Sequence, residues 1–173
     1  RLGYAAFATR LNINGTSNID STWCIGFDSR NTSAYLATPG LEGATTPNAS
    51  IGFSGDTCGN YKTISTLSAT FKQPGDKVVY TLTIGNGGNI NAAIESISVD
   101  NENVTSNKTI IKGNIKYTIE MPLSTTIVAN QTTTMKVTAE FQNDTDIAQY
   151  TTGETQSINV KINAIQDNGS NGM

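Results

Sequence analysis

The sequence contains no histidine among its 173 residues. That absence excludes Ser-His-Asp and Cys-His catalysis, zinc sites of the His-Glu-x-x-His type and most other transition-metal sites. A phosphate-binding loop with a following Lys and Ser or Thr is also missing from the sequence. The sequence therefore predicts a protein that is not an enzyme and that uses no cofactor. A secreted hydrolase that works with a pair of carboxylates is the alternative left open.

Charge is also scarce, since only 14% of the residues are charged and the net charge is −3. Without a basic cluster, nucleic acid is not expected as a partner. No apolar run approaches the roughly 20 residues that span a bilayer, so we expect no membrane span. Thr, Ser, Asn and Gly are abundant instead, and these residues suit strands and turns. This composition is typical of a secreted protein located outside the cell or on its surface.

Cysteine occurs only twice, as Cys24 and Cys58. An even count in a chain of this composition favours one disulfide formed in an oxidising compartment, with two buried free thiols as the alternative. Closing a loop of about 35 residues would contribute roughly 3–4 kcal/mol of stability. The chain begins at Arg1 without a methionine, and we expect either a mature form that has lost its signal peptide or a trimmed chain.

The most informative stretch runs from Gln73 to Asn89. Pro74-Gly75-Asp76 predicts a turn, and the next eight residues alternate between apolar and mostly polar side chains, as expected for a strand. The Asn86-Gly87-Gly88-Asn89 cluster then predicts a hairpin turn.

Alternating apolar positions recur along the rest of the chain. A first strand is expected from Leu2 to Ile13, a short edge strand around 34–37, and a short strand at 51–53 before a turn at 54–56. The polar stretch 100–107 is expected to be a loop. The other alternating stretches contain the apolar sets Trp23, Ile25, Phe27; Leu67, Ala69, Phe71; Ile94, Ile97, Val99; Ile115, Tyr117, Ile119; Met135, Val137, Ala139, Phe141; and Ile158, Val160, Ile162, Ala164. Roughly nine strands at this spacing predict an all-β, two-sheet antiparallel sandwich.

Two further patterns concern surface chemistry. Eight Asn-x-Ser/Thr sequences are candidate N-glycosylation sites, and composition alone accounts for about half of that number; they begin at Asn14, Asn31, Asn48, Asn103, Asn107, Asn130, Asn143 and Asn168. The acidic stretches 100–103 and 143–146 contain oxygen ligands of the kind that calcium accepts, but neither has the EF-hand spacing. Solvated loops explain both stretches equally well.

Three segments resemble the TasA/camelysin-like family of secreted proteins, which form biofilm-matrix fibres in bacteria and bundling pili in archaea. They are the start, Gly3-Tyr4-Ala5-Ala6-Phe7; the stretch from Phe71-Lys72-Gln73-Pro74-Gly75-Asp76-Lys77 to Asn86-Gly87-Gly88-Asn89-Ile90; and the closing strand 156–166. The resemblance covers about the first 15 residues, residues 65–100 and that closing strand. The cysteine pair and the Thr-rich stretch 30–50 depart from the bacterial members. Camelysin has been regarded as a protease, but no proteolytic role carries over to a chain without histidine.

The resemblance implies a jelly-roll-like sandwich whose subunits polymerise head to tail by donor-strand complementation. In this mechanism an extended N-terminal segment of one subunit fills an open groove in the next. Within residues 1–12, the residues expected to contact the next subunit are Leu2, Tyr4, Ala6, Phe7 and Ala8. The sandwich domain is then expected over 13–165, followed by a flexible polar tail over 166–173.

The expected partners are identical subunits in a filament, with neighbouring filaments as further candidates. Two alternatives stay open at this point. Residues 1–10 could form the first strand of their own sandwich. The chain could also be a monomeric Ig-like adhesin or stalk module, although neither a sortase signal nor an internal repeat supports that function.

Overall fold

The computed structural model describes residues 21–30, 33–142 and 153–167, and within these ranges it contains strands and no helix. The strands are β1 (Ile25–Asp28), β2 (Ala34–Thr38), β3 (Asn48–Cys58), β4 (Tyr61–Phe71), β5 (Lys77–Asn86), β6 (Ala92–Val99), β7 (Glu102–Val104), β8 (Lys108–Lys112), β9 (Ile115–Glu120), β10 (Thr126–Ile127), β11 (Thr132–Phe141) and β12 (Glu154–Gln166). The paired strands are antiparallel. The predicted all-β antiparallel class is confirmed, and the jelly-roll-like sandwich stays a prediction.

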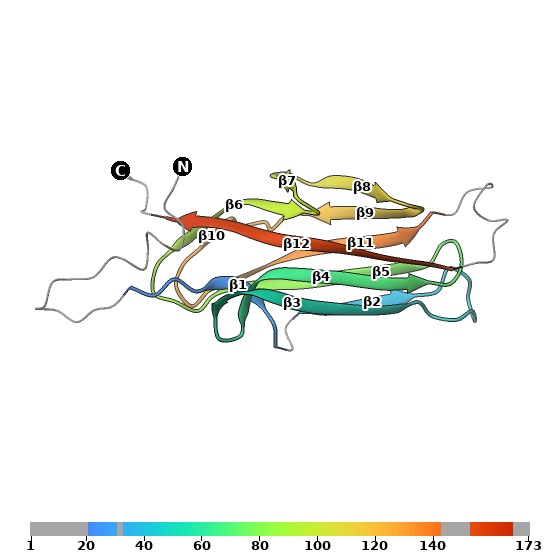
Figure 1. Cartoon of the computed structure of the whole chain (residues 1–173), viewed down its shortest axis with the longest axis horizontal. Helices are drawn as coiled ribbons and strands as arrows, with labels where there is room; N and C mark the ends of the chain where they lie inside the picture. The colour runs from blue at the N-terminus through green and yellow to red at the C-terminus, as the bar shows by residue number, and fades with distance from the viewer. Residues whose placement is uncertain (1–20, 31–32, 143–152, 168–173) are drawn as a thin grey trace, which may run out of the picture.

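Two series of hydrogen-bonded strands make up the fold. One series runs β3–β4–β12–β6, with β7 and β10 also paired to β6, and the other runs β2–β5–β11–β9–β8. Strand β1 joins the two series, because Phe27 pairs with Lys62 of β4 and with Ile84 of β5. The result is a nearly closed antiparallel sheet whose long strands follow the long axis of the molecule (Figure 1).

The turn between β4 and β5 forms where Pro74-Gly75 predicts it. The N–H of Asp76 donates to the carbonyl of Gln73 at 3.2 Å, and Gly75 has φ +91°. Pro at the second position and a positive φ at the third are the requirements of a type II turn, which explains the order Pro-Gly. The turn carries the chain from one series to the other, because β4 and β5 do not pair with each other.

Alternating side chains of the long strands meet in one hydrophobic core. In β5, the side chains of Val78, Tyr80, Leu82 and Ile84 are fully buried, as their spacing predicts. The other long strands contribute Leu67, Ala69, Phe71, Ile115, Tyr117, Ile119, Met135, Val137, Ala139, Phe141, Ile158, Val160 and Ile162 to the same core. The period-2 prediction is therefore confirmed for β4, β5, β9, β11 and β12.

The outer face of β4 and β12 carries short polar side chains that bond across the two strands. Thr66 donates to Asn159 at 2.7 Å. The hydroxyls of Ser68 and Ser157 lie 2.7 Å apart, and those of Thr70 and Thr155 lie 3.0 Å apart. Directly opposed hydroxyl and amide side chains stabilise paired strands without requiring charge.

Several local predictions were wrong. The short strand expected at 51–53 is part of β3, which has 11 residues and continues through the turn expected at 54–56. The polar stretch 100–107 is not only a loop, because it contains β7. The Gly87-Gly88 cluster is not a hairpin turn, since β5 and β6 belong to different series.

The spacing of the apolar residues in β6 has a specific cause. Asn163 pairs with Ser96 but the next residue, Ala164, pairs with Ile94, so Glu95 is the extra residue of a β-bulge. The bulge lets Ile94 and Ile97 both face the core although they are three positions apart.

A search of the described residues for a membrane-spanning helix finds none of sufficient length and hydrophobicity.

Candidate functional site

In the part of the chain that the structure describes, the sheet is open between β2 and β3. Among the described strands, β2 pairs only with β5 and β3 pairs only with β4. The two strands are neighbours, and each has one edge without a partner strand. Such an edge presents backbone N–H and C=O groups that another strand can pair with. We call the space between these two edges the seam.

Inward-facing side chains along the seam are incompletely covered. Tyr35 of β2 lies opposite Tyr80, with ring centroids 6.3 Å apart, and directly opposed residues share a face of the sheet. Tyr80 is 1% exposed, yet Tyr35 is 46% exposed. On β3, Ile51 and Phe53 are only half-buried although they lie opposite buried residues of β4. The core therefore continues into the seam, and no described residue covers it there.

A cavity of ≈ 450 Å³ opens between the two edge strands. It is lined by Ser29, Arg30, Ser33, Ala34, Tyr35, Ile51 and Phe53. Three of these residues are the partly exposed inward-facing side chains, and the others surround the start of β2. The cavity therefore combines an apolar wall with a polar rim.

The charged group at the rim is paired with a buried one. The Arg30 side chain donates to both carboxylate oxygens of Asp28, at 2.8 and 2.7 Å, while Asp28 itself is 2% exposed. The Arg30 guanidinium also lies 5.6 Å from the ring centroid of Tyr61. Hydrogen bonding and charge pairing with Asp28 raise the pKa of Arg30 above its ordinary value. The guanidinium at the rim is therefore neutralised locally by the carboxylate.

The serines of the rim also form hydrogen bonds within the same chain. Ser29 Oγ donates to the carbonyl of Asn60 at 2.7 Å. Ser33 Oγ donates to the carbonyl of Asp28 at 3.1 Å and accepts from the N–H of Thr83 at 3.0 Å. An apolar group could enter the cavity without separating any of these polar groups from its partner.

The disulfide closes one end of the seam. Cys24 directly precedes β1 and Cys58 ends β3, and their Cα atoms lie 5.6 Å apart, within the usual range for a disulfide. The bond ties the end of an edge strand to the strand that joins the two series. The predicted pairing is confirmed, and it indicates that the chain folds in an oxidising compartment.

A buried carboxylate fixes the other end. Oδ1 of Asp76 accepts from the N–H of Gly40 at 2.7 Å, and Oδ2 accepts from the N–H groups of Lys72 and Gln73 at 2.6 and 3.1 Å. The side-chain amide of Gln73 donates to Asp76 and to the carbonyl of Thr45. Because Gly40 and Thr45 belong to the β2–β3 connection, Asp76 holds that connection against the β4–β5 turn.

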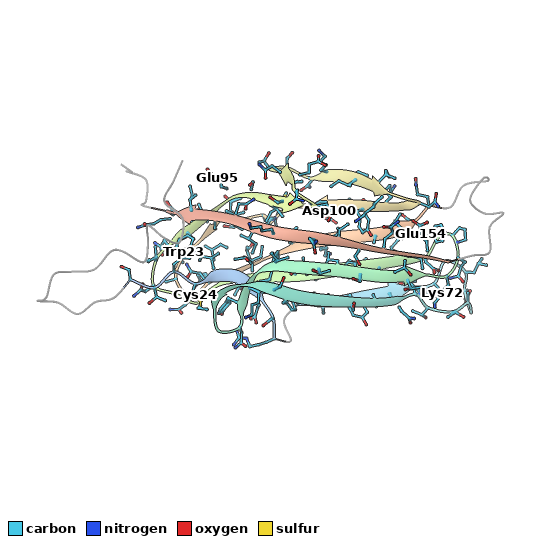
Figure 2. All side chains as sticks on the ribbon, viewed as in Figure 1. Trp23, Cys24, Lys72, Glu95, Asp100 and Glu154 are labelled. Atoms are coloured by element: carbon cyan, nitrogen blue, oxygen red, sulfur yellow. A yellow bond between two sulfur atoms is a disulfide. The ribbon has the colours of Figure 1, made fainter. Side chains whose placement is uncertain are left out.

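Both ends of the seam are thus attached to the rest of the molecule. Figure 2 labels one residue from each attachment, Cys24 and Lys72, and these lie toward opposite ends of the long axis. The seam between them follows the long axis of the molecule, as β2 and β3 do (Figure 1).

The residues expected to enter a neighbouring subunit lie outside the described ranges; they are Leu2, Tyr4, Ala6, Phe7 and Ala8. Four candidate glycosylation residues also lie outside these ranges: Asn14, Asn31, Asn143 and Asn168.

The four described candidate glycosylation residues are exposed, and glycosylation stays a prediction for all of them. Asn48 begins β3, and Asn130 has a positive φ of 66°. Oδ1 of Asn103 accepts from Ser98 at 3.1 Å, and Oδ1 of Asn107 accepts from the N–H of Met121 at 2.8 Å.

The first acidic stretch pairs with lysines. Asp100 forms an ion pair of 2.9 Å with Lys112 and accepts from the N–H of Asn159, and Glu102 pairs with Lys108. Within the residues that the structure describes, no group of three or more Cys, Asp or Glu side chains could hold a metal ion. The stretch 143–146 lies outside those residues.

Sequence reasoning missed the seam residues Tyr35, Ile51 and Phe53. Their local signal is weak, because Ala and Leu flank Tyr35, Ser and Gly flank Ile51 and Phe53, and the strand alternation is short. Comparisons of this chain with models of protein families, with curated proteins and with solved structures give no match.

Proposed function

We propose that this chain is the structural subunit of an extracellular filament, of the pilus or biofilm-fibre type, in which subunits join head to tail by donor-strand complementation. The single observation that supports this function is the seam: two edges that no described strand pairs with, and half-covered apolar side chains between them. An added strand would pair with one of these edges, cover the apolar side chains between them and complete a jelly-roll-like sandwich.

The dimensions of the seam fit the N-terminal segment. Residues 48–54 of β3, whose alternate side chains face inward, extend over roughly 23 Å at the usual rise of a strand. Residues 2–9 are uncharged and lie between Arg1 and Arg10, so an uncharged stretch of similar length is available. Covering the side chains of Tyr35, Ile51 and Phe53 would contribute on the order of 2–4 kcal/mol, before any backbone pairing is counted.

Donation from one subunit to the next leaves the seam of the first subunit free for another copy. Such a head-to-tail contact does not close on itself and therefore generates a filament. If each chain filled its own seam instead, the subunit would be a closed monomer of the stalk or adhesin type.

Isotope-mixed cross-linking of the full chain distinguishes these two outcomes. A photoreactive residue replaces Ala6 in 15N-labelled chains, which are mixed with unlabelled chains under assembly conditions and inspected by negative-stain electron microscopy. We expect filaments, and cross-links from labelled residue 6 to unlabelled β2 or β3. Monomers with cross-links only inside labelled chains would overturn the proposal.

A chain that lacks residues 1–10 provides the second measurement. We expect it to stay monomeric while circular dichroism shows a folded β protein. If it forms filaments as readily as the full chain, the segment is not the connecting strand.

A further inference from the structure

We infer that the cavity at the start of β2 is the anchor pocket for one side chain of the entering strand, and that this side chain is Phe7. The inference rests on the proposed function and adds to it the residue that sets the register of the joint. In strand addition, main-chain hydrogen bonds provide affinity and pockets for individual side chains provide specificity.

The chemistry of the pocket selects an uncharged, apolar side chain. Its wall consists of Tyr35, Ile51 and Phe53, and the polar groups of its rim are engaged by partners in the same subunit. A group that brought its own hydroxyl or charge inside would find few free partners there. An aromatic ring placed between Tyr35 and Phe53 would instead gain the favourable contacts of aromatic pairs.

Three residues of the N-terminal segment are large enough to act as an anchor: Leu2, Tyr4 and Phe7. Leu2 follows Arg1 directly and would bring that cation to a rim whose carboxylate, Asp28, is already paired with Arg30. Tyr4 would carry its hydroxyl into the apolar wall. Phe7 lacks a polar atom and lies three residues from Arg10.

The neighbours of Phe7 fit the same assignment. Ala5, Ala6 and Ala8 are small and permit close approach of the entering backbone to β2 and β3. Because side chains of a strand alternate, Phe7 facing inward places Ala5 inward and Tyr4 outward. One large inward side chain between small ones defines a single register, since a shift of one residue would turn Phe7 away from the pocket.

Assembly of full-length variants tests the inference. The critical concentration for filament formation is measured for Phe7→Ala, Phe7→Leu and Tyr4→Ala. Removal of a buried aromatic side chain predicts an increase of about a hundredfold or more for Phe7→Ala. We expect the increases for Phe7→Leu and for Tyr4→Ala to be smaller than the increase for Phe7→Ala.

A double-mutant cycle between Phe7 and a residue of the pocket wall tests whether the two side chains are in contact. Phe53→Ala in the receiving subunit also raises the critical concentration, and the double variant with Phe7→Ala is expected to be less impaired than the product of the two single effects. Thermal unfolding of the Phe53→Ala monomer checks that the subunit stays folded. Should that variant not fold, Ile51→Val replaces it in the same cycle.

Three results would overturn the inference and leave donor-strand assembly intact: filaments of Phe7→Ala that form as readily as those of the unaltered chain, a larger effect of Tyr4→Ala than of Phe7→Ala, or fully independent effects in the double variant. Failure of the unaltered chain to form filaments would instead contradict the proposed function itself.

Discussion

The carboxylate of Asp76 accepts a hydrogen bond from the backbone N–H of Gly40 at 2.7 Å, across 36 positions of sequence. Asp76 is fully buried, and the same carboxylate accepts the N–H groups of Lys72 and Gln73. The sequence around Asp76 indicates only a turn. In the structure, Asp76 also attaches the β2–β3 connection to the end of the core.

Asp76→Ala is expected to lower the free energy of unfolding by roughly 3 kcal/mol or more, because it leaves several N–H groups without an acceptor. Denaturant unfolding measures the change, and Lys77→Ala, at the exposed next position, is the matched control. Equal stabilities of the two variants would show that the carboxylate does not hold the turn.

Reduction of the disulfide is expected to lower the free energy of unfolding by roughly 3–4 kcal/mol, since Cys24 and Cys58 close a long loop of the unfolded chain. Urea unfolding with and without a phosphine reductant measures the difference. The double variant Cys24→Ala/Cys58→Ala should have the stability of the reduced chain and should not respond to the reductant. A response of that variant would mean that the reductant acts elsewhere.

Gly26→Ala is expected to destabilise the folded protein by about 1–3 kcal/mol, through overpacking at the place where β1 joins the two series. A Cβ at this position would lie 2.6 Å from the backbone N and O of Lys62. Gly52→Ala on β3 is the control, because its Cβ would meet Thr66 only at ordinary contact distances of 3.8–3.9 Å. The prediction fails if thermal unfolding shows the same change for both variants.

Alkaline pH is expected to unfold the protein through two buried tyrosines. Burial raises the pKa of Tyr80 and of Tyr117 above the ordinary value of 10.0. Above that value the unfolded chain loses protons that the folded chain retains. The stability supplied by each neutral tyrosine is therefore fully present below pH 10 and is lost as the pH rises above it, by at most about 1.4 kcal/mol per pH unit.

Denaturant unfolding between pH 8 and 12 measures this loss. Tyr117→Phe should decrease the slope of the unfolding free energy against pH above pH 10. A slope that Tyr117→Phe leaves unchanged would assign the alkaline transition to other groups.

The long strands could be predicted from the sequence because their signal is local. Val78, Tyr80, Leu82 and Ile84 alternate without interruption and follow a Pro-Gly turn, and the structure buries all four. The cysteine pairing could also be predicted, since the chain contains no other thiol.

The candidate site could not be predicted in the same way, because it depends on which strands pair with which. Tyr35, Ile51 and Phe53 would be ordinary core residues if β2 and β3 paired with each other. Only the pairing pattern shows that they face an open seam. The link between Asp76 and Gly40 is likewise a tertiary contact, and no local pattern in the Thr- and Gly-rich stretch 30–50 indicates it.

The attachment of both ends of the seam bears on the kinetics of any strand that enters it. Because the disulfide and the Asp76 carboxylate hold the two ends of the seam in advance, the folded chain would have little conformational entropy left to lose when a strand enters. The cost of ordering then falls on the entering segment alone. A preorganised receptor of this kind is expected to release an entering strand slowly, so its affinity would be expressed mainly in a low dissociation rate.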